Sequence, residues 1–146
     1  MEVFEHFTLL KRLYDTLLRP VTRQYSLTRM ELDILLFLAN NPVYDTARDI
    51  VQVRVLSKSQ VSMSLETLAA RAYLRAECAE NNRKVQHLHL LPAADDAVRD
   101  GRAAQASFRA VLSRGISADE QAAFAQLNER VANNIRTYLK EGTSKC

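Results

Sequence analysis

The fold is decided by residues 56–74, LSKSQVSMSLETLAARAYL, in which a helical repeat of apolar side chains gives way to the alternation of a strand. Because a helix turns by about 100° per residue, the repeat places four side chains on one buried edge: Val61, Leu65, Leu68 and Ala72. The opposite face carries short, mostly uncharged polar side chains, and Ser57 is placed to cap the helix. A face without long lysines and glutamates can approach another surface closely.

The next segments, YLRAECAE (73–80) and RKVQHLHLL (83–91), alternate in polarity as strands do. Asn81-Asn82 between them suits a tight turn that needs positive φ. These segments therefore predict a hairpin, and its tip is basic because Arg83 and Lys84 follow the turn.

A short helix, ARDIVQVRV (47–55), is predicted before the polar-faced helix, with Asp45 or Thr46 as its cap and with Ile50 and Val53 buried. The order of short helix, polar-faced helix and basic-tipped hairpin is that of a winged helix-turn-helix. In this module the second helix enters the major groove of DNA, and the hairpin reaches the minor groove or the backbone. The expected DNA contacts are Arg54, Ser57, Lys58, Ser59, Gln60, Ser62, Met63, Arg83 and Lys84.

These side chains have different expected roles. Ser57 and Lys58 suit a phosphate at the start of the polar-faced helix. The three side chains expected to reach base edges are Ser59, Gln60 and Ser62. Met63 either touches a thymine methyl group or is an ordinary surface methionine.

The module is preceded by two predicted helices. An apolar stripe runs through residues 3–21, where Pro20 is expected to kink the helix or end its first part near Arg19. Thr28 and Glu31 form a capping box at the start of a helix that is apolar on most sides and belongs in a core.

Two further helices are predicted after the hairpin. One runs from about residue 93 to 114 and is closed by Gly115. The other starts with a capping box of Ser117 and Glu120 and is expected to bury side chains spaced three and four apart: Phe124, Leu127, Val131, Ile135 and Tyr138. Both terminal stripes are long for a monomer, so they favour a homodimer over packing within the chain alone.

Composition fits one globular domain, since 146 residues with 47% hydrophobic and 25% charged side chains suffice for a single core. Residues 47–93 hold seven Lys/Arg against four Asp/Glu, and this local excess favours a nucleic-acid module.

No apolar run is long enough for a membrane span, and acidic residues stand near the N-terminus where a signal peptide has lysines. We therefore expect a cytoplasmic protein with no membrane partner. Cys78 and Cys146 cannot make a disulfide framework.

The stretches SLTRMELDILLFLANNP (26–42) and LSKSQVSMSLETLAARAYL (56–74), with Asn82-Arg83-Lys84 at the wing tip and LLPAA at 90–94, resemble the MarR family of bacterial transcription regulators. The resemblance covers nearly the whole chain and implies a mostly α-helical fold with a small β-hairpin, a winged helix-turn-helix flanked by dimerisation helices. It implies one domain over 1–146, with the DNA module at 28–92 and dimerisation helices at 1–27 and 93–141. It also implies a pseudo-palindromic operator of double-stranded DNA, and release from it when a small-molecule effector binds.

The chain departs from the family pattern at four positions. Met30 replaces a glutamine, Met63 an arginine, Ala72 the glycine before the wing, and Asn82 the wing aspartate, or Asn81 does so if the matching triplet is Asn81-Asn82-Arg83. The missing aspartate would brace the wing arginine, so Arg83 is either less ordered or held by the amide oxygen of Asn82.

Other classes of protein find less support. No phosphate-binding loop, nucleophile elbow or zinc-protease motif is present, so no enzyme and no cofactor are expected. His87 and His89 share a strand face, but no further ligands lie close in sequence and no metal site is expected. Cys78 fits a small half-buried residue better than a redox switch.

A winged helix used only for protein contact remains the alternative, because the polar-faced helix carries little charge. Nothing in the sequence identifies an effector or its binding residues. Aromatic and histidine side chains between the terminal helices and the module are equally explained as core residues: Phe4, His6, Phe7, Tyr14 and Tyr25.

Overall fold

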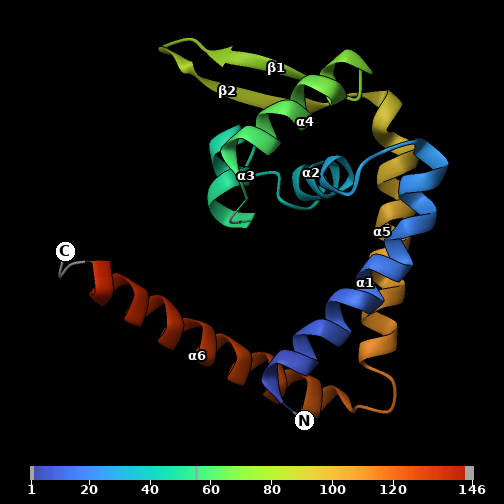
Figure 1. The fold of residues 1–146 in the computed structure, drawn as a ribbon, viewed down its shortest axis with the longest axis vertical. Helices are drawn as coiled ribbons and strands as arrows, with labels where there is room; N and C mark the ends of the chain where they lie inside the picture. Colours follow the sequence, from blue (N-terminus) through green and yellow to red (C-terminus); the bar gives the residue numbers. More distant parts are fainter. Residues whose placement is uncertain (1, 55, 144–146) are drawn as a thin grey trace. The chain divides into compact units, whose positions relative to one another are not determined.

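The computed structural model describes residues 2–54 and 56–143 and shows a mostly α-helical chain with one antiparallel hairpin (Figure 1). It forms two compact units, Met1–Phe108 and Arg109–Cys146. The predicted winged-helix fold is confirmed. The elements are α1 (Val3–Tyr25), α2 (Arg29–Asn40), α3 (Ala47–Arg54), α4 (Lys58–Ala70), β1 (Leu74–Ala79), β2 (Asn82–Leu90), the 3-10 helix η1 (Pro92–Ala94), α5 (Asp95–Leu112) and α6 (Ala118–Thr143).

Helix α2 is the centre of the core and lies between the α3–α4 pair and the α1–α5 pair (Figure 1). Its buried side chains cover most of its circumference: Leu32, Ile34, Leu35, Leu36, Phe37 and Leu38. The predicted capping box is present, because the Thr28 hydroxyl accepts from the Glu31 amide at 3.1 Å and a Glu31 carboxylate oxygen accepts from the Thr28 amide at 3.0 Å. Gly101 of α5 lets that helix approach closely, since a Cβ there would lie 2.8 Å from Leu36 Cδ2.

Pro20 does not end the first helix, which continues through it to Tyr25. Proline removes one backbone donor, whereas the residues after it keep theirs. Leu18 and Val21 are buried on either side of Pro20, so packing against the core holds this part of the helix in place.

Helix α3 buries only one of the two side chains predicted to be inside. Ile50 is fully buried, but Val53 is 51% exposed. The half-buried Val51 packs against the core instead, so the buried face of α3 is the one that carries Ile50 and Val51. Its cap is Thr46, whose hydroxyl accepts from the Asp49 amide at 3.1 Å.

Helix α4 ends at Ala70, earlier than predicted, and Ala72 is exposed rather than part of the buried edge. Its amide donates to Ala69 O at 3.0 Å and the Tyr73 amide donates to Leu68 O at 2.9 Å, the two bonds of a Schellman motif. Such a motif needs a left-handed residue at its turning point, and Ala72 has φ of 58°.

We expect Ala72→Gly to raise the free energy of unfolding by roughly 0.5–1 kcal/mol, because glycine adopts positive φ without the steric cost of a Cβ. Ala69→Gly, within α4 and exposed, is the matched control and should lower it by about 1 kcal/mol. Urea denaturation measures both. Equal destabilisation by the two changes would contradict the interpretation.

The hairpin pairs β1 with β2, with Leu74 opposite Leu90 and Glu77 opposite His87. Its turn differs from the prediction: the turn is at Glu80-Asn81, Asn82 already belongs to β2, and neither asparagine has positive φ. The register shifts between Cys78 and Ala79. An irregularity of this kind increases the local twist of the strands, so the hairpin closes without a left-handed residue in its turn.

The second unit contains α6, whose predicted capping box is present. The Ser117 amide donates to Glu120 at 3.1 Å, and this hydrogen bond lowers the pKa of the Glu120 carboxyl. The predicted burial of the α6 stripe is wrong for the chain by itself: its five side chains are 56–75% exposed, because no element of this unit covers them.

Cys78 also differs from its prediction, since it is exposed rather than half-buried. Cys146 lies outside the described residues. Among the helices of the described chain, none combines the length and the apolar character needed to cross a membrane.

Candidate nucleic-acid interface

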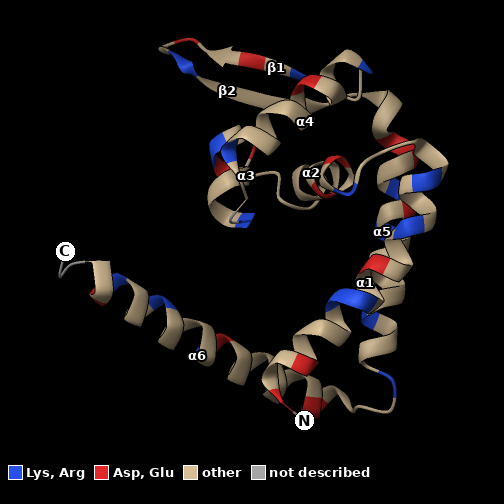
Figure 2. Cartoon of the chain, in the orientation of Figure 1, with Lys and Arg blue, Asp and Glu red and all other residues tan. Residues whose placement is uncertain are grey.

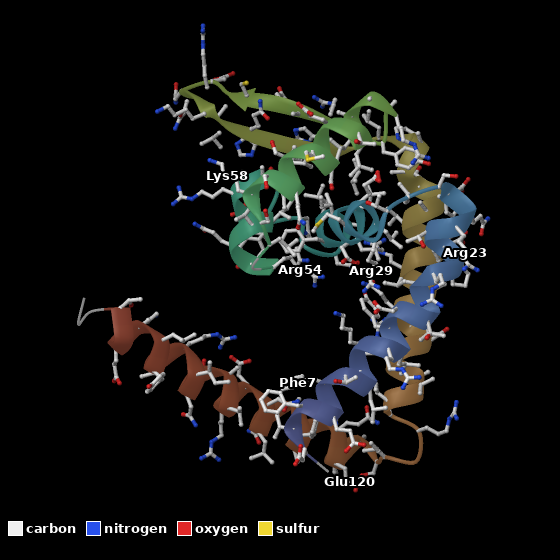
Figure 3. The ribbon with its side chains drawn as sticks, in the orientation of Figure 1. Phe7, Arg23, Arg29, Arg54, Lys58 and Glu120 are labelled. Atoms are coloured by element: carbon white, nitrogen blue, oxygen red, sulfur yellow. The ribbon has the colours of Figure 1, made fainter. Side chains whose placement is uncertain are left out.

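The polar face of α4 is accessible along the whole predicted contact surface. Val61 and Leu68 are buried and fix the helix against the core, while its exposed side includes Ser57, Lys58, Ser59, Gln60, Ser62 and Met63. Lys58 lies at the start of α4, near the α3 side of the module (Figure 3). The surface therefore combines hydrogen-bonding groups with little charge.

Ser57 occupies the N-cap position but its side chain makes no capping bond. Its hydroxyl instead lies 3.0 Å from the Ser59 hydroxyl. The predicted side-chain cap is therefore wrong. The first amides of α4 have no side-chain acceptor from Ser57, so they remain available to an anion at the helix start.

The wing tip carries the clearest positive charge of the module. Arg83 and Lys84 are exposed, and neither side chain forms an ion pair within residues 2–54 and 56–143. Arg75, further along the hairpin, pairs with Glu77 at 3.2 Å. Figure 2 shows a basic and an acidic segment at the hairpin tip, where Glu80 stands in the turn before Arg83 and Lys84, and a further acidic segment along β1. Asn82 accepts from the Lys84 amide at 3.0 Å and so orders the tip rather than bracing Arg83.

Arg54 of α3 is less free than the wing cations. Its guanidinium lies 3.7 Å from Asp33 of α2, and Asp33 also accepts from Arg29 at 3.0 Å. Arg71, another of the seven Lys/Arg of residues 47–93, points to the end of α1 and donates to the backbone carbonyls of Tyr25 and Ser26. The positive charge of Arg71 is therefore used to hold two parts of the chain together and is not available to DNA.

The two strand histidines each face a carboxylate. His87 Nδ1 lies 2.9 Å from Asp45, and His89 Nε2 lies 3.3 Å from Glu77. The described residues contain no cluster of three or more metal-ligating side chains. Together with the Leu88 amide, which donates to Asp45 O at 2.7 Å, His87 ties the wing to the loop before α3.

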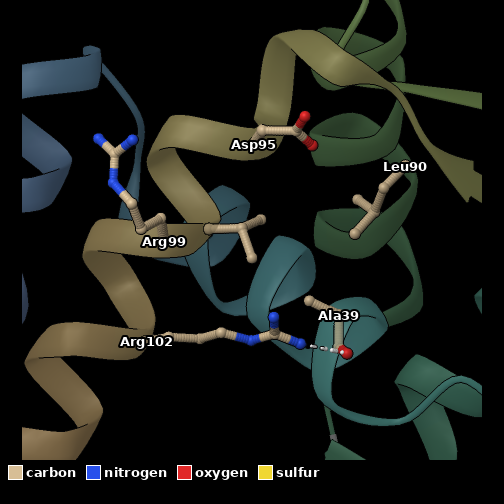
Figure 4. Close-up of a pocket in the computed structure, with 6 residues that line it drawn as sticks. Ala39, Leu90, Asp95, Arg99 and Arg102 are labelled. Atoms are coloured by element: carbon tan, nitrogen blue, oxygen red, sulfur yellow. Dashed lines mark hydrogen bonds between the residues drawn. The ribbon is translucent and has the colours of Figure 1, made fainter.

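Two cavities lie in the first unit. The larger, about 530 Å³, is open and lies between α2, the end of β2 and α5 (Figure 4): Ala39, Leu90, Asp95, Val98, Arg99 and Arg102. Arg102 donates to Ala39 O at 2.7 Å, which secures the end of α2. The smaller, about 80 Å³, lies between α1, α2, α3 and α5: Tyr14, Asp33, Leu36, Phe37, Asn40, Asn41, Arg54 and Gln105. Of the aromatic residues considered above for an effector, Tyr14 lines this cavity, whereas Phe4 and Phe7 are exposed.

The MarR family model matches residues 25–84, from the end of α1 to the wing tip. The resemblance to the MarR family is confirmed. The chain is also similar to a transcriptional regulator named PA3341, with 26% identity over 90% of this chain and 98% of that one and a TM-score of 0.72.

More distant structures share the MarR fold. A putative MarR family transcriptional regulator from Listeria monocytogenes, solved with 26mer DNA, has 15% identity, a TM-score of 0.82, and coverage of 97% of this chain and 96% of that one. The transcriptional regulator SlyA has 14% identity, a TM-score of 0.78, and coverage of 92% and 94%. No curated protein matches the sequence.

Proposed function

We propose that this MarR-like chain is a homodimeric, sequence-specific regulator of transcription that binds a pseudo-palindromic site in double-stranded DNA. The observation that carries the proposal is the combination of an exposed, mostly uncharged hydrogen-bonding face on α4 with two wing-tip cations that have no ion-pair partner among the described residues. DNA recognition needs both, because base edges are read by hydrogen bonds and phosphates are held by charge. The Listeria relative solved with DNA supports the same use of the fold.

The proposed contacts divide by chemistry. Phosphates would be held by Arg54, Ser57, Lys58, Arg83 and Lys84, of which Arg54 must share its charge with Asp33. Ser59, Gln60 and Ser62 would read base edges in the major groove. Met63 is 69% exposed and could contact a thymine methyl group.

Dimerisation is proposed from the uncovered apolar stripes. Val3, Phe4 and Phe7 on α1, and the stripe of α6, are exposed in the single chain. Apolar patches of this extent on a protein surface mark interaction sites.

The proposed organisation is one cytoplasmic domain, with residues 1–27 and 93–141 as dimerisation helices and 28–92 as the DNA module. A small-molecule effector that releases DNA is proposed with it, and the two cavities are the candidate places.

We expect Gln60→Ala to cost about 1–3 kcal/mol of binding free energy for each specific contact and to relax preference at one symmetric pair of operator positions. The measurement is selection from a randomised duplex library, first with the unmodified chain, then with alanine at Ser59, Gln60 or Ser62. Gln24→Ala, an exposed glutamine on α1, is the matched control.

Unchanged base preference in all three α4 variants would reject α4 as the reading helix. If the unmodified dimer selects no sequence at all, the alternative of a winged helix for protein contact is favoured. The low charge of α4 is the observation that supports that alternative.

A further inference from the structure

Helices α1 and α4 end in the same way, and their ends meet. At the end of α1, the Ser26 amide donates to Arg23 O at 3.4 Å and the Leu27 amide to Thr22 O at 2.9 Å, with φ of 51° at Ser26. This is the Schellman arrangement already described for α4 at Ala72. Such an end leaves carbonyl groups of the last turn facing outward, with the partial negative charge of the helix dipole.

Arg71, the C-cap residue of α4, binds the outward carbonyls of α1. Its Nη2 donates to Tyr25 O at 2.6 Å and its Nη1 donates to Ser26 O at 2.8 Å. The guanidinium also lies over the Tyr73 ring, 4.6 Å from its centroid. A planar guanidinium can make two parallel bonds and stack at once, whereas a lysine ammonium cannot.

The connection continues from α1 to α5. The Tyr25 hydroxyl donates to Asp100 Oδ2, and Arg99 donates to Asp100 Oδ1 at 3.2 Å. The hydrogen bond from Tyr25, followed by that from Arg99, lowers the pKa of Asp100, so this carboxylate stays ionised. A continuous set of hydrogen bonds thus joins the end of α4 to α5 through the end of α1.

We propose that Arg71, Tyr25 and Asp100 form a latch that fixes the orientation of α4 relative to α5, and that this orientation sets the half-site spacing which the dimer reads. The proposal rests on the proposed function for its DNA-binding consequence. Arg71 is a positioning residue in it and contacts no phosphate. In a two-fold dimer, a small rotation of each reading helix changes the distance between them and so the preferred operator spacing.

The first test uses Arg71→Lys, which keeps the charge but cannot make both carbonyl bonds and the stack. The probes are duplexes built from the operator that the unmodified chain selects, with half-sites moved apart or together by single base pairs. We expect affinity at the preferred spacing to fall by about twofold to thirtyfold, the size of effect found for residues that act on a binding site from a distance. The difference in affinity between the preferred spacing and the others should become smaller. Arg75→Lys, on the exposed face of β1, is the matched control and should change neither.

Salt dependence separates positioning from phosphate contact. With Arg71→Ala, a positioning role predicts an unchanged slope of log affinity against log salt. A slope shallower by about 1.8, for two phosphates in the dimer, would show that Arg71 binds DNA and would overturn the proposal. A wild-type spacing preference in Arg71→Lys would overturn it as well.

Hydrogen exchange in the absence of DNA tests the latch independently of the proposed function. We expect Arg71→Lys to speed hydrogen exchange at the Ala72 and Tyr73 amides, which close the end of α4, and Tyr25→Phe to do so to a smaller extent. Unchanged exchange in Arg71→Lys would overturn the latch whether or not the chain binds DNA. An effect of Arg71→Lys with none from Tyr25→Phe would overturn the link to α5. Thermal unfolding of each variant checks that the fold is retained.

Discussion

Replacing Leu127 and Val131 by aspartate is expected to abolish the dimer. Both side chains lie on the exposed stripe of α6, 56% accessible in the single chain. Burying one such side chain in an interface contributes about 1.5–3 kcal/mol, so the four in a dimer contribute roughly 6–12 kcal/mol. At about 1.4 kcal/mol for each factor of ten, the dimer dissociation constant should rise by about 10⁴-fold or more.

Sedimentation equilibrium measures this change directly. Ala122→Asp with Ala125→Asp adds the same charge to the opposite side of α6 and is the matched control, expected to remain dimeric. Because a palindromic site needs both reading helices, operator binding should be lost together with the dimer. A stable dimer in the stripe variant would place the dimer interface elsewhere, and a stable folded monomer of the unmodified chain at micromolar concentration would reject dimerisation itself.

Replacing Arg83 and Lys84 by alanine is expected to weaken binding to every DNA sequence. The change removes four positive charges from a dimer, all at exposed wing tips without carboxylate partners in the described chain. If all four meet phosphates, the slope of log affinity against log salt becomes shallower by about 3.6, since each neutralised phosphate contributes roughly 0.9 on duplex DNA. Titrations at several salt concentrations, with operator and with random duplex, give the slope.

Lys11→Ala with Arg12→Ala removes an adjacent pair of exposed cations from α1 and serves as the control for net charge. This variant should leave the slope near its original value. A wing variant with unchanged affinity and slope would remove the hairpin from the DNA interface and strengthen the protein-contact alternative. Loss of base preference without a change of slope would assign the wing a role in reading base edges instead of holding phosphates.

Local chemistry made much of the fold predictable. The capping boxes of Thr28 with Glu31 and of Ser117 with Glu120 are sequence-local, because the bonding groups are three residues apart. The same holds for the change from helical to strand periodicity within residues 56–74 and for the basic tip. These predictions depend only on neighbours along the chain, and the structure confirms them, although the equally local cap predicted at Ser57 is absent.

Errors arose where a side chain's surroundings come from distant parts of the chain. Val53 and the α6 stripe have the apolar spacing of buried residues, but spacing does not say which element covers them or whether any does. The positive φ expected at Asn81-Asn82 occurs instead at Ser26 and Ala72, where helix ends demand it. The hairpin turn does without it because its register shifts before the turn.

Residue type and periodicity along residues 56–91 are enough to predict a winged helix with a short-chained polar face on α4 and two cations at the wing tip, because these are properties of short segments. Which cations of the module are accessible to DNA depends instead on how distant segments pack. Arg71 lies 45 residues or more from the carbonyls that bind it, and Tyr25 is 75 residues from Asp100. Hydrogen bonds over such separations leave no periodic signal, because they depend on where whole helices pack and not on the spacing of residues within them.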